Sequence, residues 1–165
     1  MAFNLSTELS IEEITLNKHG DKIFVSSEDS ALFDNYVKCF DFIVKQSKSK
    51  QAEIEEIEKK YDGKEDIESE IEMVVELSRV NVDFANAGIK EIDGIFGDGT
   101  VRKYFRDHYE KIESFLPGVD CFMDFFDQMS PVMEHLFGKV VKDREKASKA
   151  RMAKYQPQDH KRKQK

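Results

Sequence analysis

Residues 119–141, VDCFMDFFDQMSPVMEHLFGKVV, decide the fold of this chain because they carry its clearest hydrophobic pattern. Large apolar side chains recur there at spacings of three, four and seven residues, which is the period of one face of an α-helix. The residues on this face are Phe122, Phe125, Phe126, Met129, Val132, Met133, Leu136, Phe137 and Val140. Pro131 lies inside the pattern, where it removes a backbone donor and is expected to bend the helix. The stretch predicts a long amphipathic helix with an aromatic face.

A glycine turn and a short helix are expected before this aromatic helix. Residues 94–100, GIFGDGT, end one helical pattern, and Asp98 or Thr100 is expected to cap the next helix. The turn superficially resembles a phosphate-binding loop, but no Gly-Lys-Ser or Gly-Lys-Thr follows it and no strand precedes it. The sequence therefore favours a turn between two helices.

Two long helical patterns fill the middle of the chain. An unbroken helix over residues 28–61 would be about 50 Å long, and its apolar face gives way to charged residues after Ser47. A second pattern follows Asp62-Gly63, and a short turn between two long helices predicts a helical hairpin. Its expected apolar side comprises Ile67, Ile71, Val74, Val75, Val80, Phe84, Ala87, Ile92 and Ile95. Gly88 and Gly94 are expected to weaken its later turns.

The N-terminal part of the chain alternates in the manner of strands. Apolar residues stand at every second position on both sides of residues 17–21, NKHGD, which predicts a β-hairpin at 13–25 that lies on a helix. The expected fold is mainly α, with four to five helices, a long helical hairpin and this small β-hairpin. We expect a single helical domain over residues 1–141 and a basic, partly disordered tail over 142–165.

Charge is strongly segregated along the 165 residues. Residues 139–165 hold 11 basic and 3 acidic residues, whereas residues 1–138 hold 15 basic and 30 acidic ones. An acidic body repels nucleic acid and anionic lipid, so neither is the expected partner of the basic tail. No apolar run is long enough to cross a bilayer and no secretion signal is visible, so we expect a soluble intracellular protein.

No arrangement of residues in the sequence predicts catalysis. The four histidines are far apart, and none has the spacing of a zinc ligand set. Cys39 and Cys121 fall on apolar helix faces, so they are expected to be buried rather than nucleophilic or disulfide-bonded. The glutamates of residues 53–58, together with Lys59 and Lys60, are typical of a solvated helix face. We therefore expect a protein without enzymatic activity, metal or cofactor.

The aromatic stripe and the basic tail each allow two interpretations. The stripe is either ordinary core or the lining of a groove for the helix of a partner, because Met and Phe adapt to varied apolar surfaces. Phe125 and Met129 are the residues that we expect to be accessible in such a groove. The tail is either a solubilising end or a segment that binds a partner by charge.

Three short stretches resemble the small tail assembly chaperones of tailed bacteriophages. They are the turn Ile95-Phe96-Gly97-Asp98-Gly99-Thr100, the aromatic helix around Phe122-x-x-Phe125-Phe126, and the ending Lys154-Tyr155-x-Pro157 before basic residues. The resemblance covers residues 90–165. In that family, the gene lies between those of the major tail tube protein and the tape measure protein.

The resemblance implies a helical, non-enzymatic protein that coats the long apolar helix of the tape measure protein, keeps it soluble and helps to recruit tail tube subunits. It implies a location in the cytoplasm of the bacterial host and absence from the mature virion. The candidate partner-binding residues are Phe96, Gly97, Gly99, Phe122, Phe125, Phe126, Met129, Met133, Tyr155 and Pro157. The alternative is a non-enzymatic structural or adaptor protein that associates with itself, although its heptads are not sustained as in a long coiled coil.

Overall fold

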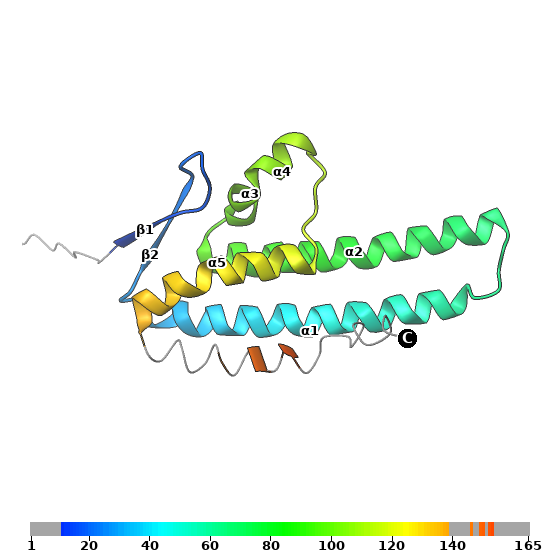
Figure 1. Cartoon of the computed structure of the whole chain (residues 1–165), viewed down its shortest axis with the longest axis horizontal. Helices are drawn as coiled ribbons and strands as arrows, with labels where there is room; N and C mark the ends of the chain where they lie inside the picture. The colour runs from blue at the N-terminus through cyan, green and yellow to red at the C-terminus, as the bar shows by residue number, and fades with distance from the viewer. Residues whose placement is uncertain (1–10, 139–145, 147–148, 151, 154–165) are drawn as a thin grey trace, which may run out of the picture.

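Two long antiparallel helices form the frame of the protein in the computed structural model (Figure 1). The structure describes residues 11–138, 146, 149–150 and 152–153. Within these residues the elements are β1 (Ile11–Thr15), β2 (Lys22–Ser26), α1 (Ser30–Lys60), α2 (Ile67–Phe96), α3 (Thr100–Tyr104), α4 (Arg106–Lys111) and α5 (Val119–Phe137). The prediction of a mainly helical fold with a long helical hairpin and a small β-hairpin is confirmed.

An aspartate caps the N-terminus of each helix of the hairpin, α1 and α2. The carboxylate of Asp29 accepts a hydrogen bond from the amide of Ala31 at 3.0 Å, and Asp66 accepts one from Ser69 at the same distance. Each bond satisfies an amide that the first turn of a helix leaves unpaired. Gly63 joins the helices with a φ of +75°, a conformation that favours glycine. We call residues 51–83, which form the far end of this hairpin, the arm.

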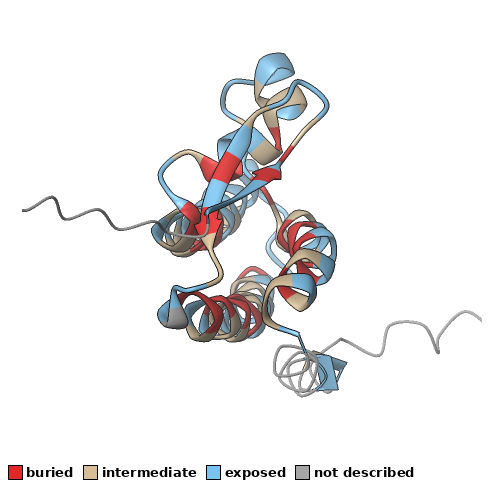
Figure 2. Ribbon diagram, turned by 90° about the vertical axis from the view of Figure 1, so that its left-hand side faces the viewer, coloured by how far each residue is buried: buried red, intermediate tan, exposed pale blue. Residues whose placement is uncertain are grey.

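Helix α5 is the third member of a bundle with α1 and α2. The Phe33 ring stacks on Phe137 at 5.3 Å, and Phe40 meets Phe126 edge-on at 5.1 Å, so α5 runs antiparallel to α1. Phe122 contacts Phe84 of α2 at a ring distance of 5.7 Å. Figure 2 shows the buried faces of the three helices turned toward one another. The core therefore lies along α5, and the arm continues beyond it.

A small lobe covers one side of the bundle. Strands β1 and β2 pair antiparallel, with Ile14 opposite Ile23, and both side chains are buried. Helices α3 and α4 lie beside the hairpin, and the buried Val101 and Phe105 join the same core. The predicted hairpin thus places its apolar side on the helices, as a two-stranded sheet requires in water.

The outer part of α2 differs from the sequence prediction. Ile67, Ile71, Val74 and Val75 were placed on one apolar side with the buried residues Phe84 and Ile92, but all four are exposed. Only the later residues of that face lie where α5 and the lobe can cover them. On the arm, the half-buried apolar residues of α2 are Met73, Leu77 and Val80, on the side where Glu76 binds Lys60 of α1.

Gly88 is required by the close approach of α5 to α2. A Cβ atom at Gly88 would lie 2.5 Å from the Phe122 Cζ atom, much closer than carbon atoms approach one another. Phe122 is completely buried, so its ring has little freedom to move away. Gly94, on the exposed side of the same helix, has no heavy atom within 4 Å of its Cβ position. Helix α2 continues without a break through both glycines.

These two glycines give a matched pair of substitutions. Gly88→Ala is expected to lower the free energy of unfolding by about 1–3 kcal/mol, because the added methyl group overpacks the core against Phe122. Gly94→Ala is expected to raise it by about 0.5–1 kcal/mol, because alanine loses less backbone entropy in a helix. Urea unfolding followed by circular dichroism measures both. Equal effects of the two substitutions would contradict the contact between α2 and α5.

Candidate functional site

The predicted partner-binding side chains on α5 lie in the core. Phe122, Phe125, Phe126, Met129 and Met133 are buried, as is Phe96 at the end of α2, which at 7% is the most exposed of the six. The expectation that Phe125 and Met129 are accessible in a groove is therefore wrong. The physical reason is that α5 is the middle element of the core and uses its whole aromatic face to hold α1, α2 and the lobe together. An aspartate at either position would bury a charge and unfold the protein.

The predicted glycine turn has an internal role. Gly97 and Gly99 have φ values of +110° and +81°, which glycine adopts without strain. The Asp93 carboxylate of α2 accepts hydrogen bonds from the amides of Gly99 at 3.1 Å and Val101 at 3.0 Å. The expected cap by Asp98 or Thr100 is wrong, since Gly99 holds the cap position and Asp93 reaches over it from the preceding helix. Tyr155 and Pro157 lie outside the described residues.

Asp93 is therefore expected to stabilise the turn. Asp93→Ala leaves two amides at the start of α3 without their acceptor, so the free energy of unfolding should fall by about 1–2 kcal/mol. Asp98→Ala, at an exposed position in the same turn, is the control and should change it by less than about 0.5 kcal/mol. Urea unfolding compares the two. A larger loss for Asp98→Ala would show that the carboxylate of Asp98 forms the cap.

An apolar groove runs between α1 and α5 on the outside of the bundle. It encloses about 350 Å³. Its floor consists of Tyr36, Val37, Phe40, Met123 and Phe126. Phe126 is the member of the predicted set that reaches this groove, while Phe125 and Met129 line a hollow beneath the β-hairpin. The sequence missed Met123 because it stands one position outside the aromatic stripe.

A piece of the C-terminal segment lies in this groove. Lys149, Met152 and Ala153 line it together with α1 and α5, and Met152 packs against the core. Figure 2 shows the described pieces of this segment on the outside of the bundle. The groove therefore already accommodates side chains from a segment that is not part of the bundle.

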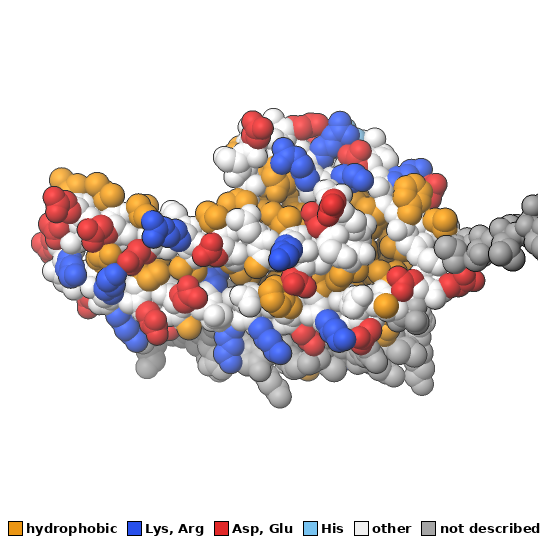
Figure 3. All heavy atoms as spheres, turned by 180° about the vertical axis from the view of Figure 1, so that it is seen from behind, with side chains coloured by type: hydrophobic (Ala, Val, Ile, Leu, Met, Phe, Trp, Pro, Cys, Tyr) orange, Lys and Arg blue, Asp and Glu red, His pale blue; other side chains and the backbone are white. Residues whose placement is uncertain are grey.

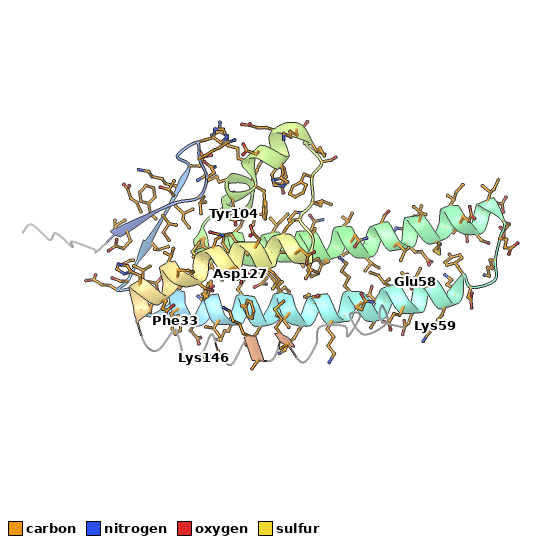
Figure 4. All side chains as sticks on the ribbon, viewed as in Figure 1. Phe33, Glu58, Lys59, Tyr104, Asp127 and Lys146 are labelled. Carbon is orange, nitrogen blue, oxygen red and sulfur yellow. The ribbon has the colours of Figure 1, made fainter. Side chains whose placement is uncertain are left out.

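The rim of the groove is acidic, whereas its occupant is basic. Asp120 and Asp127 lie on the exposed edge of α5, in the same lining as Lys149. Figure 4 labels Asp127 on α5 and Lys146 on the C-terminal segment. Within the floor, Tyr36 and Ser130 hydrogen-bond to each other through their hydroxyl groups at 2.9 Å. The groove can therefore bury an apolar side chain of a segment whose basic side chains lie near the acidic rim.

The groove gives a prediction about its own occupant. Met152→Glu should release the C-terminal segment, because a carboxylate cannot stay in an apolar groove with an acidic rim. We expect a rise in the fluorescence of a dye that binds exposed apolar surface, and a loss of about 1 kcal/mol of stability. Ala150→Glu, at an exposed position of the same segment, is the control and should change neither. Unchanged dye binding in Met152→Glu would show that Met152 does not cover the groove.

Charged side chains attach the β-hairpin to α4. Arg106 binds Asp21 at 3.0 Å, and His19 contacts Asp107 at 2.7 Å. The hydrogen bond from Asn17 and then that from Arg106 hold the pKa of Asp21 below its ordinary value, and His19 does the same for the pKa of Asp107. These bonds favour the ionised carboxylates, so their contribution to stability is present above the ordinary pKa and is lost as the pH falls below it.

Among the described residues, three side chains between the β-hairpin and α4 could converge on a metal ion. Ligand atoms of His19, Asp107 and Glu110 lie within 4.8 Å of one another. Lys18 and Arg106 already bind the two carboxylates, at 3.3 Å and 2.8 Å. These ion pairs explain the cluster as an attachment of the hairpin to α4.

Comparisons with protein-family models, with curated proteins and with solved structures give no match to this chain. None of the described helices combines the length and the apolar character needed to span a membrane.

Proposed function

We propose that this protein is a tail assembly chaperone of a tailed bacteriophage. It binds helical segments of the tape measure protein, keeps that protein soluble and helps to recruit tail tube subunits. The resemblance of the glycine turn, the aromatic helix and the C-terminal ending to that family supports the identity of the partner. The groove between α1 and α5 supports the mode of binding.

The single observation behind this proposal is that Met152, from a segment outside the bundle, packs against the core and lines the groove. An apolar floor formed by Val37, Phe40 and Met123 can accept other apolar side chains, because methionine and phenylalanine adapt to different shapes. An amphipathic helix that is laid in such a groove inserts side chains at a spacing of three or four residues. The tape measure protein is a long helix with an apolar surface and offers many such segments.

The C-terminal segment gives the groove a way to release its client. A client helix must displace Met152 before it can bind, and this competition lowers the apparent affinity of each copy. Met152 of the C-terminal segment packs on the groove again when the client leaves. This covers the apolar floor and so protects the protein from aggregation. A chaperone of this kind binds in many copies along a long client, each of them weakly. The acidic body keeps neighbouring copies from associating with one another.

Co-expression tests the proposal directly. The tape measure protein encoded beside this chain should become soluble and co-purify with it. Met123→Glu, which puts a charge in the groove, should reduce co-purification at least about tenfold. Gln128→Glu adds the same charge to an exposed position elsewhere on α5 and should have no effect. Met152→Glu should increase co-purification, because it removes the competing segment.

The outcomes separate the function from the site. If the wild-type chain does not solubilise the tape measure protein, the proposed function is wrong. If it does, but Met123→Glu binds as well as Gln128→Glu, the client binds at another surface. Circular dichroism of Met123→Glu must show a folded protein, and Val37→Gln provides a milder change in the same groove.

A further inference from the structure

A second apolar surface lies on the arm, away from the groove between α1 and α5. Five large aliphatic side chains of α2 are between 39% and 73% exposed. They are Ile67, Ile71, Val74, Val75 and Val82, which we call the arm stripe. Figure 3 shows hydrophobic side chains gathered at the free end of the arm, among acidic ones.

The positions of these residues make the arm stripe one continuous helix face. Ile71 follows Ile67 by four residues, Val74 and Val75 follow Ile71 by three and four, and Val82 follows Val75 by seven. The stripe extends over about 22 Å of helix. The side of α2 that packs on α1 is occupied by other residues, because Glu76 binds Lys60 of α1 at 2.8 Å and Leu77 beside it is half-buried. The arm stripe thus lies on α2 away from α1.

The arm stripe continues a face that is covered elsewhere in the molecule. Farther along α2, Ala85, Ile92 and Phe96 are buried in the core with Val101 of α3. At the junction, Ile89 of α2 and Leu116 of the loop before α5 line a shallow hollow. The same helix face is therefore used for packing along its second half and is bare along its first half, where neither α5 nor the lobe reaches.

The charge around the arm stripe selects its partner. The arm, residues 51–83, contains twelve acidic and four basic residues. Glu68, Glu70 and Glu72 are exposed and flank the stripe on its two sides. A helix with lysine or arginine beside its apolar face would meet opposite charges there, which raises both the rate of association and its specificity.

Two occupants from the chain itself fit this surface poorly. A second copy that docks through the same stripe would bring Glu68, Glu70 and Glu72 against their own counterparts, and like charges oppose such pairing. The described residues Lys149, Met152 and Ala153 of the basic C-terminal segment already line the groove between α1 and α5, away from the arm. The surface therefore fits a helix from another protein.

We propose that the arm stripe docks an amphipathic α-helix of another protein, with about four turns of apolar face bordered by lysine and arginine. The docked helix lies along α2 beside the lobe and turns the two-helix arm into a local three-helix packing. This surface is separate from the groove between α1 and α5, and the inference does not rest on the proposed function.

A pair of synthetic peptides tests the inference with the full-length chain. Each peptide is a labelled helix of about 18 residues with leucine on one face; one carries lysine beside that face and the other carries glutamate. Fluorescence anisotropy should give a Kd at least about tenfold lower for the lysine peptide, and salt should weaken its binding. Equal binding of the two peptides, or no binding of the lysine peptide, would overturn the proposal.

Matched variants locate the binding. Ile71→Ser combined with Val74→Ser removes apolar surface without changing charge, and it should weaken binding of the lysine peptide at least about tenfold. Ala52→Ser, at an exposed position of the arm on α1, is the control and should bind normally. All of these residues are exposed, so circular dichroism should show an unchanged fold.

Two further variants test whether charge contributes to peptide binding and whether the peptide binds on the arm stripe or in the groove. Glu68→Gln, Glu70→Gln and Glu72→Gln together should remove the preference for the lysine peptide. Met123→Glu should leave peptide binding intact, because it alters only the groove between α1 and α5. Sedimentation tests the remaining occupant: a dimer that Ile71→Ser with Val74→Ser converts to monomer would assign the arm stripe to a second copy and overturn the proposal.

Discussion

Burial of the aromatic face of α5 between α1 and α2 is the interaction on which the rest of the structure depends. Phe122 fits against α2 only because Gly88 has no side chain, and Phe126 meets Phe40 of α1 on the other side. Phe125 extends the same packing to Phe96 and Tyr104, so one helix joins both long helices and the lobe. Because aromatic rings bury large areas in fixed relative orientations, this packing fixes how α1, α2 and the lobe are arranged around α5.

The position of α5 also determines which apolar surfaces remain for a partner. Its aromatic face packs in the core, so two other apolar surfaces remain for binding. Along one edge of α5, Met123 and α1 form a groove that Met152 also lines. Beyond the first turn of α5, α1 covers one side of α2 but no described element covers the opposite side, where the arm stripe from Ile67 to Val82 is exposed. The two surfaces share acidic surroundings, and both therefore favour basic helical segments.

The sequence predicted the local elements well and their partners less well. Asp62-Gly63 and the helical patterns around it indicated the hairpin, and the period of residues 119–137 indicated α5. The cap by Asp93 was missed because this carboxylate acts across a turn on amides six and eight residues later. The aromatic stripe with Phe125 and Met129 was left open between core and groove, because periodicity shows that a face is apolar but does not show what covers it.

The sequence by itself determined the long helices and the β-hairpin, because these depend on neighbours within a few residues, and its composition determined the separation of an acidic body from a basic tail. Only the tertiary structure decided that the aromatic stripe is core, that Gly88 is a contact point and that Ile67, Ile71 and Val74 are exposed. The reason is length: α2 has 30 residues and α5 has 19, so one helix cannot cover the other completely. Which part of α2 stays bare follows from where α5 begins.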